Sequence, residues 1–139
     1  MVQLVQAILS CVYSRHHDGY VREKYLRRLL TLTHPWVAPF VFQLVGEYVD
    51  EIIQLIADNS ALLLAHDHYR AFIRDNPDLV TVTWAQAITY ANLYSAPRAL
   101  ARDYRRWDAH KADVPALRFL SECCRVTQSC QGTRTTCRT

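Results

Sequence analysis

Glycine is scarce in this chain, with three residues among 139. Folds made of many short strands need frequent tight turns, and glycine supplies the backbone conformations of many such turns, so a β-sandwich or barrel is disfavoured. No stretch reaches eighteen apolar residues, so no transmembrane helix is predicted. Half of the residues are hydrophobic and 21% are charged, a composition typical of one globular domain with its own core.

Catalytic and targeting motifs are also missing from the sequence. It contains no phosphate-binding loop, dinucleotide fingerprint or nucleophile elbow. The N-terminal segment has no Lys or Arg before Arg15, which makes it a poor signal peptide, so we expect a cytoplasmic protein with reduced thiols. These absences favour a binding protein over an enzyme.

Histidine and cysteine are present, but not in spacings that suit a metal ion. His16 and His17 are adjacent, so their side chains diverge on regular structure. His66 and His68 lie about 200° apart if their segment is helical. Four cysteines near the end of the chain lack the CxxC spacing of a zinc clamp, namely Cys123, Cys124, Cys130 and Cys137. We therefore expect no metal site and no cofactor, and an inert or incidentally oxidisable role for these cysteines.

Apolar residues at helical spacing predict a first helical hairpin. The apolar stripe of its first helix, over residues 2–13, consists of Val2, Val5, Ile8, Leu9 and Val12. Asp18 and Gly19 are turn formers, and the Asp18 side chain can cap the helix that follows. The apolar rows of this second helix, which begins at Tyr20, consist of Val21, Tyr25, Leu26, Leu29, Leu30 and Leu32.

A second hairpin is predicted between residues 33 and 58. Thr33 can cap its first helix, and Pro35 suits the first turn because its missing N–H would have no partner there. Gly46 and Glu47 separate this helix from the next one. The apolar residues of that next helix are Tyr48, Val49, Ile52, Ile53 and Ile56.

Two further helix pairs are predicted in the second half of the chain. The third pair joins 61–74 to 77–94, although β-branched residues make a short strand at 79–84 the local alternative. The fourth pair joins 97–108 to 114–126. The apolar period ends at Thr127, so we expect a helical domain over residues 1–126 and a disordered tail over 127–139. The change of composition also fits a truncated or frame-shifted end. Five aromatic residues are expected to pack in the core or between repeats: Trp36, Phe40, Phe42, Tyr48 and Trp84.

The first two hairpins are similar to each other and resemble HEAT repeats. A shift of 28 residues aligns 20–23 (YVRE) with 48–51 (YVDE), and a repeat of about thirty residues with two helices is typical of α-solenoids. HEAT repeats carry Asp, then Val-Arg, then a small residue and Leu around their second helix. The matching residues here are Asp18, Val21, Arg22 and Leu26, while Tyr25 replaces the small residue.

This resemblance covers residues 5–58 and implies an all-α fold of about four stacked antiparallel helical hairpins. It also implies a ladder of contacts from one repeat unit to the next, made by the residues at the Asp18 and Arg22 positions. Asp50 stands where the second unit would have its Arg, so we do not expect the ladder to continue. Helical-repeat scaffolds bind proteins along a groove lined by the second helix of each hairpin.

Charge is unevenly distributed in a basic, acidic, basic order. Residues 1–34 carry five Lys and Arg against two acids, residues 47–78 carry seven acids against two Arg, and residues 97–118 carry six bases against three acids. We therefore expect a scaffold or adaptor without catalytic activity, whose groove binds a charged protein partner. The residues expected to face that groove are Arg22, Lys24, Glu47, Asp50 and Glu51.

Three alternatives stay open at this point. The scaffold could support an enzyme, either a lyase or a nucleic-acid-processing protein. It could bind nucleic acid through a basic helix face formed by Arg98, Arg102, Arg105 and Arg106. Self-association is a further hypothesis, because the first helix is too apolar to close the end of a helical stack.

Overall fold

A computed structural model of the chain describes residues 2–47, 49–95 and 114–128, and it contains no strand in these ranges. The prediction of an all-α protein is therefore confirmed for the described residues. Residues 79–84, where a strand was the alternative, lie inside a helix that runs from Pro77 to Tyr90. Proline suits the first turn of this helix, and Thr81 satisfies its hydroxyl by donating to the Pro77 carbonyl at 3.0 Å.

The described helices from residue 2 to residue 95 follow one another with short connections, and one more helix follows residue 113. In chain order they are α1 (Val2–Tyr13), α2 (Gly19–Leu29), the 3₁₀ turn η1 (Pro35–Val37), α3 (Ala38–Val45), α4 (Asp50–Asp58), α5 (Ser60–Ala65), α6 (Asp67–Asp75), α7 (Pro77–Tyr90), the π-turn η2 (Ala91–Ser95) and α10 (Pro115–Gln128). Helix α10 extends two residues beyond the predicted end of the domain at residue 126. The predicted helix 97–108 and residues 129–139 of the predicted tail lie outside the described residues.

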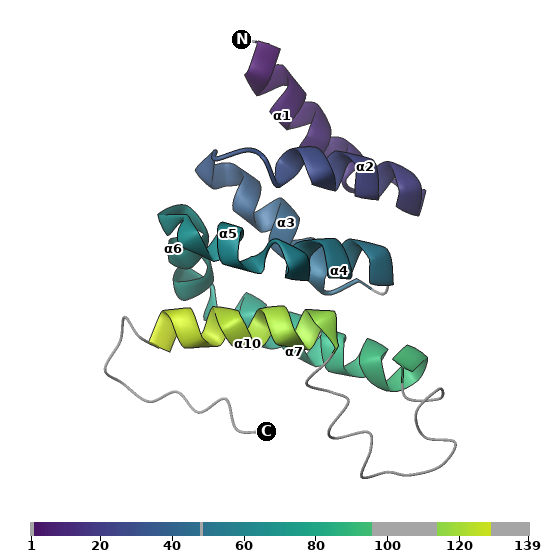
Figure 1. Cartoon of the computed structure of the whole chain (residues 1–139), viewed down its shortest axis with the longest axis vertical. Helices are drawn as coiled ribbons and strands as arrows, with labels where there is room; N and C mark the ends of the chain where they lie inside the picture. Colours follow the sequence, from purple (N-terminus) through teal and green to yellow (C-terminus); the bar gives the residue numbers. More distant parts are fainter. Residues whose placement is uncertain (1, 48, 96–113, 129–139) are drawn as a thin grey trace.

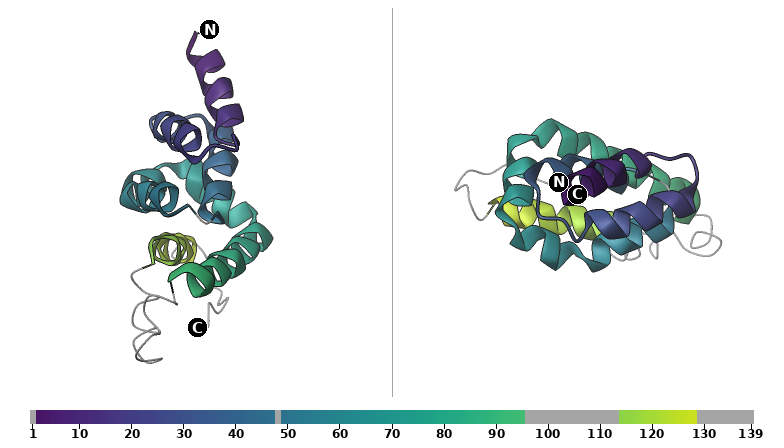
Figure 2. Two further views of the ribbon diagram at one scale, coloured as in Figure 1. Left: turned by 90° about the vertical axis from the view of Figure 1, so that its right-hand side faces the viewer. Right: turned by 90° about the horizontal axis from the view of Figure 1, so that it is seen from above.

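The helices form two layers. Figure 1 shows α2, α4 and α10 one above another across the front of the molecule, and Figure 2 shows them end-on beside a second column of α1, α3 and α7. Helix α4 packs directly against both α2 and α10, so these three helices form a continuous front layer. Helix α10, and not α7, the second helix of the predicted third pair, takes the third position in that layer, because α7 lies in the second column. Helices α5 and α6 lie at the side of the stack (Figure 1).

One cluster of buried apolar residues holds the two layers together. Phe42 of α3 lies at its centre, with its ring centroid 5.9 Å from that of Phe72 in α6 and 6.4 Å from that of Phe119 in α10. The predicted apolar rows of α2 and α4 supply buried neighbours in Leu26 and Ile52. Periodicity therefore identified the buried faces of these two helices correctly.

The predicted aromatic core is only partly present. Phe42 is fully buried, whereas Phe40 and Trp84 are half-buried against the edge of the core. Trp36 is 37% exposed, because η1 turns it outward, where it stacks on His34 at 5.6 Å between ring centroids. Tyr48 lies outside the described residues.

Helix α1 packs through a different face from the apolar stripe that its sequence suggests. Its buried residues are Ala7, Ser10 and Cys11. The branched side chains of the stripe, such as Val5 and Val12, are exposed. Small residues let α1 lie close to α2, its main neighbour, and the bulky side chains are left pointing away from the protein.

Two local predictions need correction. The segment 61–74 is not one helix, because His66 adopts an extended backbone (φ −81°, ψ 126°) that separates α5 from α6. Asp67 then begins a new helix, where its carboxylate is favoured by the helix dipole, and Tyr69 is one of the buried residues of that helix. Thr33 does not cap the next helix, because the residue before η1 is His34, whose side chain makes no capping bond.

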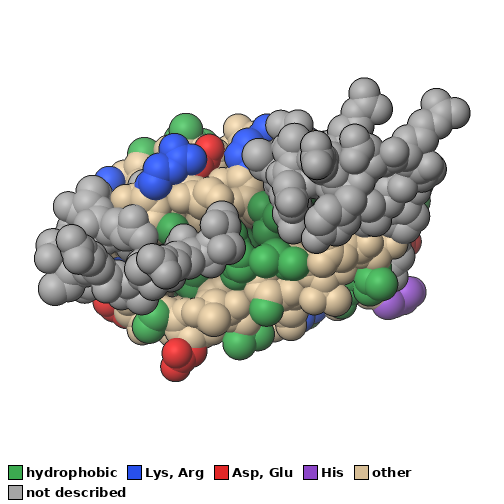
Figure 3. Space-filling view, turned by 90° about the horizontal axis from the view of Figure 1, so that it is seen from below, with side chains coloured by type: hydrophobic (Ala, Val, Ile, Leu, Met, Phe, Trp, Pro, Cys, Tyr) green, Lys and Arg blue, Asp and Glu red, His purple; other side chains and the backbone are tan. Residues whose placement is uncertain are grey.

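The end of the stack formed by α7 and α10 is shown in Figure 3. Apolar side chains gather along the middle of this face, and charged side chains lie toward its rim. Among the large apolar residues of α7 and the adjoining η2, Val82 and Leu93 are exposed.

The three-ring contact of Phe42 gives a test of the packing. Phe42→Ala removes a ring that touches α6 and α10, so we expect the free energy of unfolding to fall by about 3–5 kcal/mol. Leu62→Ala changes an exposed residue of α5 and should lower it by less than about 0.5 kcal/mol. Urea denaturation followed by circular dichroism measures both values, and equal losses would contradict the assigned core.

Candidate partner-binding surface

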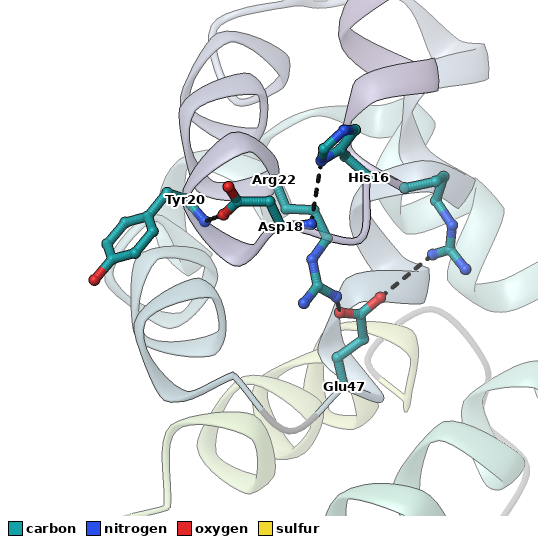
Figure 4. A network of polar contacts seen from close by, with 6 residues as sticks. His16, Asp18, Tyr20, Arg22 and Glu47 are labelled. Atoms are coloured by element: carbon teal, nitrogen blue, oxygen red, sulfur yellow. Dashed lines mark hydrogen bonds and ion pairs between the residues drawn. The ribbon is translucent and has the colours of Figure 1, made fainter.

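The turn between α1 and α2 fixes the start of the front layer. The Asp18 carboxylate accepts a hydrogen bond from the Tyr20 backbone N–H at 2.9 Å, which caps α2 as predicted. The Asp18 backbone N–H donates to Nδ1 of His16 at 3.1 Å, so His16 is part of the turn. Figure 4 shows both contacts and places Tyr20 pointing away from them.

An ion pair links α2 to the turn that precedes α4. The Arg22 guanidinium contacts the Glu47 carboxylate, and the two side chains are only 12% and 19% exposed. Arg15, in the turn after α1, lies on the other carboxylate oxygen with its Nη1 3.7 Å from Oε1. Glu47 therefore joins the turns of two consecutive hairpins (Figure 4).

The outward face of α2 is basic. Lys24, Arg27 and Arg28 are exposed there, together with Tyr20, whose exposed fraction is 86%. Arg27 contacts Glu23 at 2.6 Å, and the Arg28 guanidinium lies 5.1 Å from the centroid of the Tyr25 ring.

The outward face of α4 is acidic. Asp50 and Glu51 occupy its first turn, where the helix dipole favours negative charge, and both are exposed. At the other end of α4, Asp58 approaches Arg118 of α10 at 3.6 Å. Within the described part of the chain, Lys24, Asp50 and Glu51 form no ion pair, so their charges face solvent.

The five residues expected to face a groove fall into two groups. Arg22 and Glu47 pair with each other and are largely covered, so they position the layer. Lys24, Asp50 and Glu51 lie exposed on neighbouring helices of that layer. The four arginines of the alternative basic face, Arg98, Arg102, Arg105 and Arg106, lie outside the described residues.

Two participants were not identified from the sequence. Tyr20 shares the polar face of α2 because it lies four and seven residues before Lys24 and Arg27, a spacing that was readable in the sequence. Arg15 lies in a turn, where no periodicity indicates its direction, so its approach to Glu47 could not have been predicted.

Other chemistry in the described residues is limited. No group of three or more His, Cys, Asp and Glu there could hold a metal ion, and no described helix is long and apolar enough to cross a membrane. The rings of His66 and His68 stack with centroids 5.3 Å apart, and burial, with a smaller contribution from His66, lowers the pKa of His68. Burial raises the pKa of Cys11 to about 11 and also raises that of Cys123.

Glu47→Gln tests the link between the hairpins. It leaves a covered guanidinium without its carboxylate, so we expect the free energy of unfolding to fall by about 1–3 kcal/mol. Glu23→Gln is the matched control, since it breaks an exposed pair with Arg27 and should cost at most about 0.5 kcal/mol. Denaturation of both variants gives the comparison, and a Glu47→Gln loss no larger than that of the control would show that the link is dispensable.

Thiol reactivity tests the burial of the cysteines. In a Cys130→Ser, Cys137→Ser variant at pH 8, Cys11 with a pKa of about 11 is only about one part in a thousand thiolate, so it should react slowly with a disulfide reagent. Cys123 should also be slow, whereas half-buried Cys124 should react first. A further Cys124→Ser substitution should remove the fast phase, and three equally fast thiols would contradict the packing of α1 and α10.

Comparisons of the chain with models of protein families, with curated proteins and with solved structures found no match. The resemblance to HEAT repeats therefore stays a hypothesis, and a function has to be inferred from the surface itself.

Proposed function

We propose that the chain is a non-catalytic scaffold that binds a protein partner through the outward faces of α2 and α4. The observation that carries the proposal is the exposure of opposite charges on two helices that pack side by side, with Lys24 on α2 and Asp50 and Glu51 on α4. Tyr20 adds a large aromatic surface beside them. Aromatic residues are frequent at the energetic centres of protein interfaces, and complementary charge selects the partner.

The mixed sign of the surface favours a protein over nucleic acid. A phosphate backbone needs a continuous basic track, whereas helix α4, with its exposed acids Asp50, Glu51 and Asp58, lies between α2 and α10. A protein that presents an acidic and a basic patch at the matching spacing meets no such repulsion.

The arrangement of the helices also supports a HEAT-like scaffold as the finer form of this proposal. The second helices of two consecutive hairpins, α2 and α4, lie side by side, and Arg22 reaches the turn of the following hairpin. The acid that Arg22 contacts is Glu47. In the alignment that shifts the first hairpin by 28 residues, Glu47 lies one residue after the position that matches Asp18. We place this scaffold in the cytoplasm, since its cysteine spacings do not suit a disulfide framework.

Site-specific photo-crosslinking followed by charge reversal tests the proposal. A photoreactive amino acid placed at Tyr20 or at Glu51 should capture one and the same protein, whereas placement at exposed Thr81 on α7 should not. With that protein in hand, Glu51→Lys should weaken binding about tenfold or more, because it sets a like charge against the partner.

Asp78→Lys is the matched control for this measurement. Asp78 is also an exposed acid in the first turn of a helix, so its replacement imposes the same helix-dipole cost on a different face of the molecule. Equal loss of binding from Asp78→Lys and Glu51→Lys, or capture of different proteins from Tyr20 and Glu51, would overturn the proposed surface.

A further inference from the structure

Helix α1 exposes an unusually large apolar surface. It contains no Asp, Glu, Lys or Arg, and its outward residues reach exposed fractions of 71% at Val2 and 62% at Val12. The large apolar side chains exposed along its length are Val2, Leu4, Val5, Ile8, Leu9, Val12 and Tyr13. Buried apolar surface drives protein association, so this helix is the strongest candidate for a further interface.

The two faces of α1 have opposite character. Ala7, Ser10 and Cys11 face the protein, whereas the outward residues Val2, Val5, Leu9 and Val12 follow one another at intervals of three, four and three residues. This spacing is that of the seam of a coiled coil, in which apolar side chains of one helix fit between those of another. The outward face is therefore shaped to receive a second apolar helix.

The exposed area is sufficient for a specific contact. These seven side chains expose on the order of 600 Å², at the upper limit of about 300–600 Å² for the largest apolar patch on an ordinary monomer. A standard protein interface buries about 800 Å² on each partner, so the face of α1 with its immediate surroundings approaches that value.

We propose that the outward face of α1 is the contact surface between two copies of this chain, related by a two-fold axis. In such a dimer each copy contributes the same patch, and a patch without charge meets no like-charge repulsion from its own image. Helix α1 projects from the end of the stack opposite α10, where a second copy has access to it (Figure 1).

A membrane surface fits this helix less well than a second copy. Helices that lie on membranes carry Lys and Arg on their polar face, where these residues meet anionic lipid headgroups. The polar residues of α1 are Gln3, Gln6 and Ser10, all neutral. The dimer does not depend on the proposed partner surface, because no residue of the seam belongs to α2 or α4.

Light scattering after size-exclusion chromatography of the full chain, loaded at about 1–200 μM, measures the association. The wild-type mass should rise with concentration from 16.1 kDa toward twice that value. Two double variants, one with Val5→Glu and Val12→Glu and the other with Val5→Lys and Val12→Lys, should each stay monomeric. An equimolar mixture of the two should regain the dimer mass, because Glu and Lys then face each other across the axis whether the two α1 helices run parallel or antiparallel.

The rescue separates loss of the interface from loss of folding, since misfolded variants would not combine. Val82→Lys on α7 is the matched control, because it charges an equally exposed valine, and it should leave the association unchanged. A wild-type mass of 16.1 kDa at every concentration would overturn the proposal, as would association that persists in both double variants. Flotation of monomeric wild type with neutral phosphatidylcholine vesicles would instead assign the face to lipid.

Discussion

The contact of Phe42 with Phe72 and Phe119 joins three helices that are far apart in the sequence. The rings come from α3, α6 and α10, and they meet edge-on or tilted, as aromatic rings in protein cores prefer. Because Phe119 is held there, α10 lies against α4 and completes the front layer. The cluster therefore helps to hold α10, the last helix of the front layer, against α4, whereas α2 packs against α4 directly.

Charge has two distinct roles in that layer. Arg22 and Glu47 are covered and face each other, so they hold consecutive hairpins in register and are unsuited to contact with a partner. Lys24 and Glu51 have no such constraint and remain exposed on the surface. The sequence groups five residues as one charged set, but their burial differs. The covered residues position the helices, and the exposed residues are candidates for contact with a partner.

Apolar side chains show a similar division. In α4 the apolar row is buried, whereas in α1 the corresponding row faces solvent and small residues are buried instead. Hydrophobic periodicity locates an amphipathic face but does not say what covers it. For α4 the cover is the rest of the chain, whereas none of the described helices covers the apolar row of α1.

The sequence by itself determined the all-α class and, to within about a turn, the bounds of α1, α2 and α7. It also determined the Asp18 cap and the buried rows of α2 and α4. These features depend on local periodicity and turn chemistry. Only the tertiary structure decided the break at His66, the outward position of Trp36, the pairing of Arg15 and Arg22 with Glu47, and the place of α10 beside α4. The ion pairs and the place of α10 depend on contacts between residues distant in the chain, about which the spacing of residues along one helix carries no information. The extended backbone at His66 and the stacking of Trp36 on His34 are local, but apolar periodicity does not report backbone breaks or the direction of a turn residue.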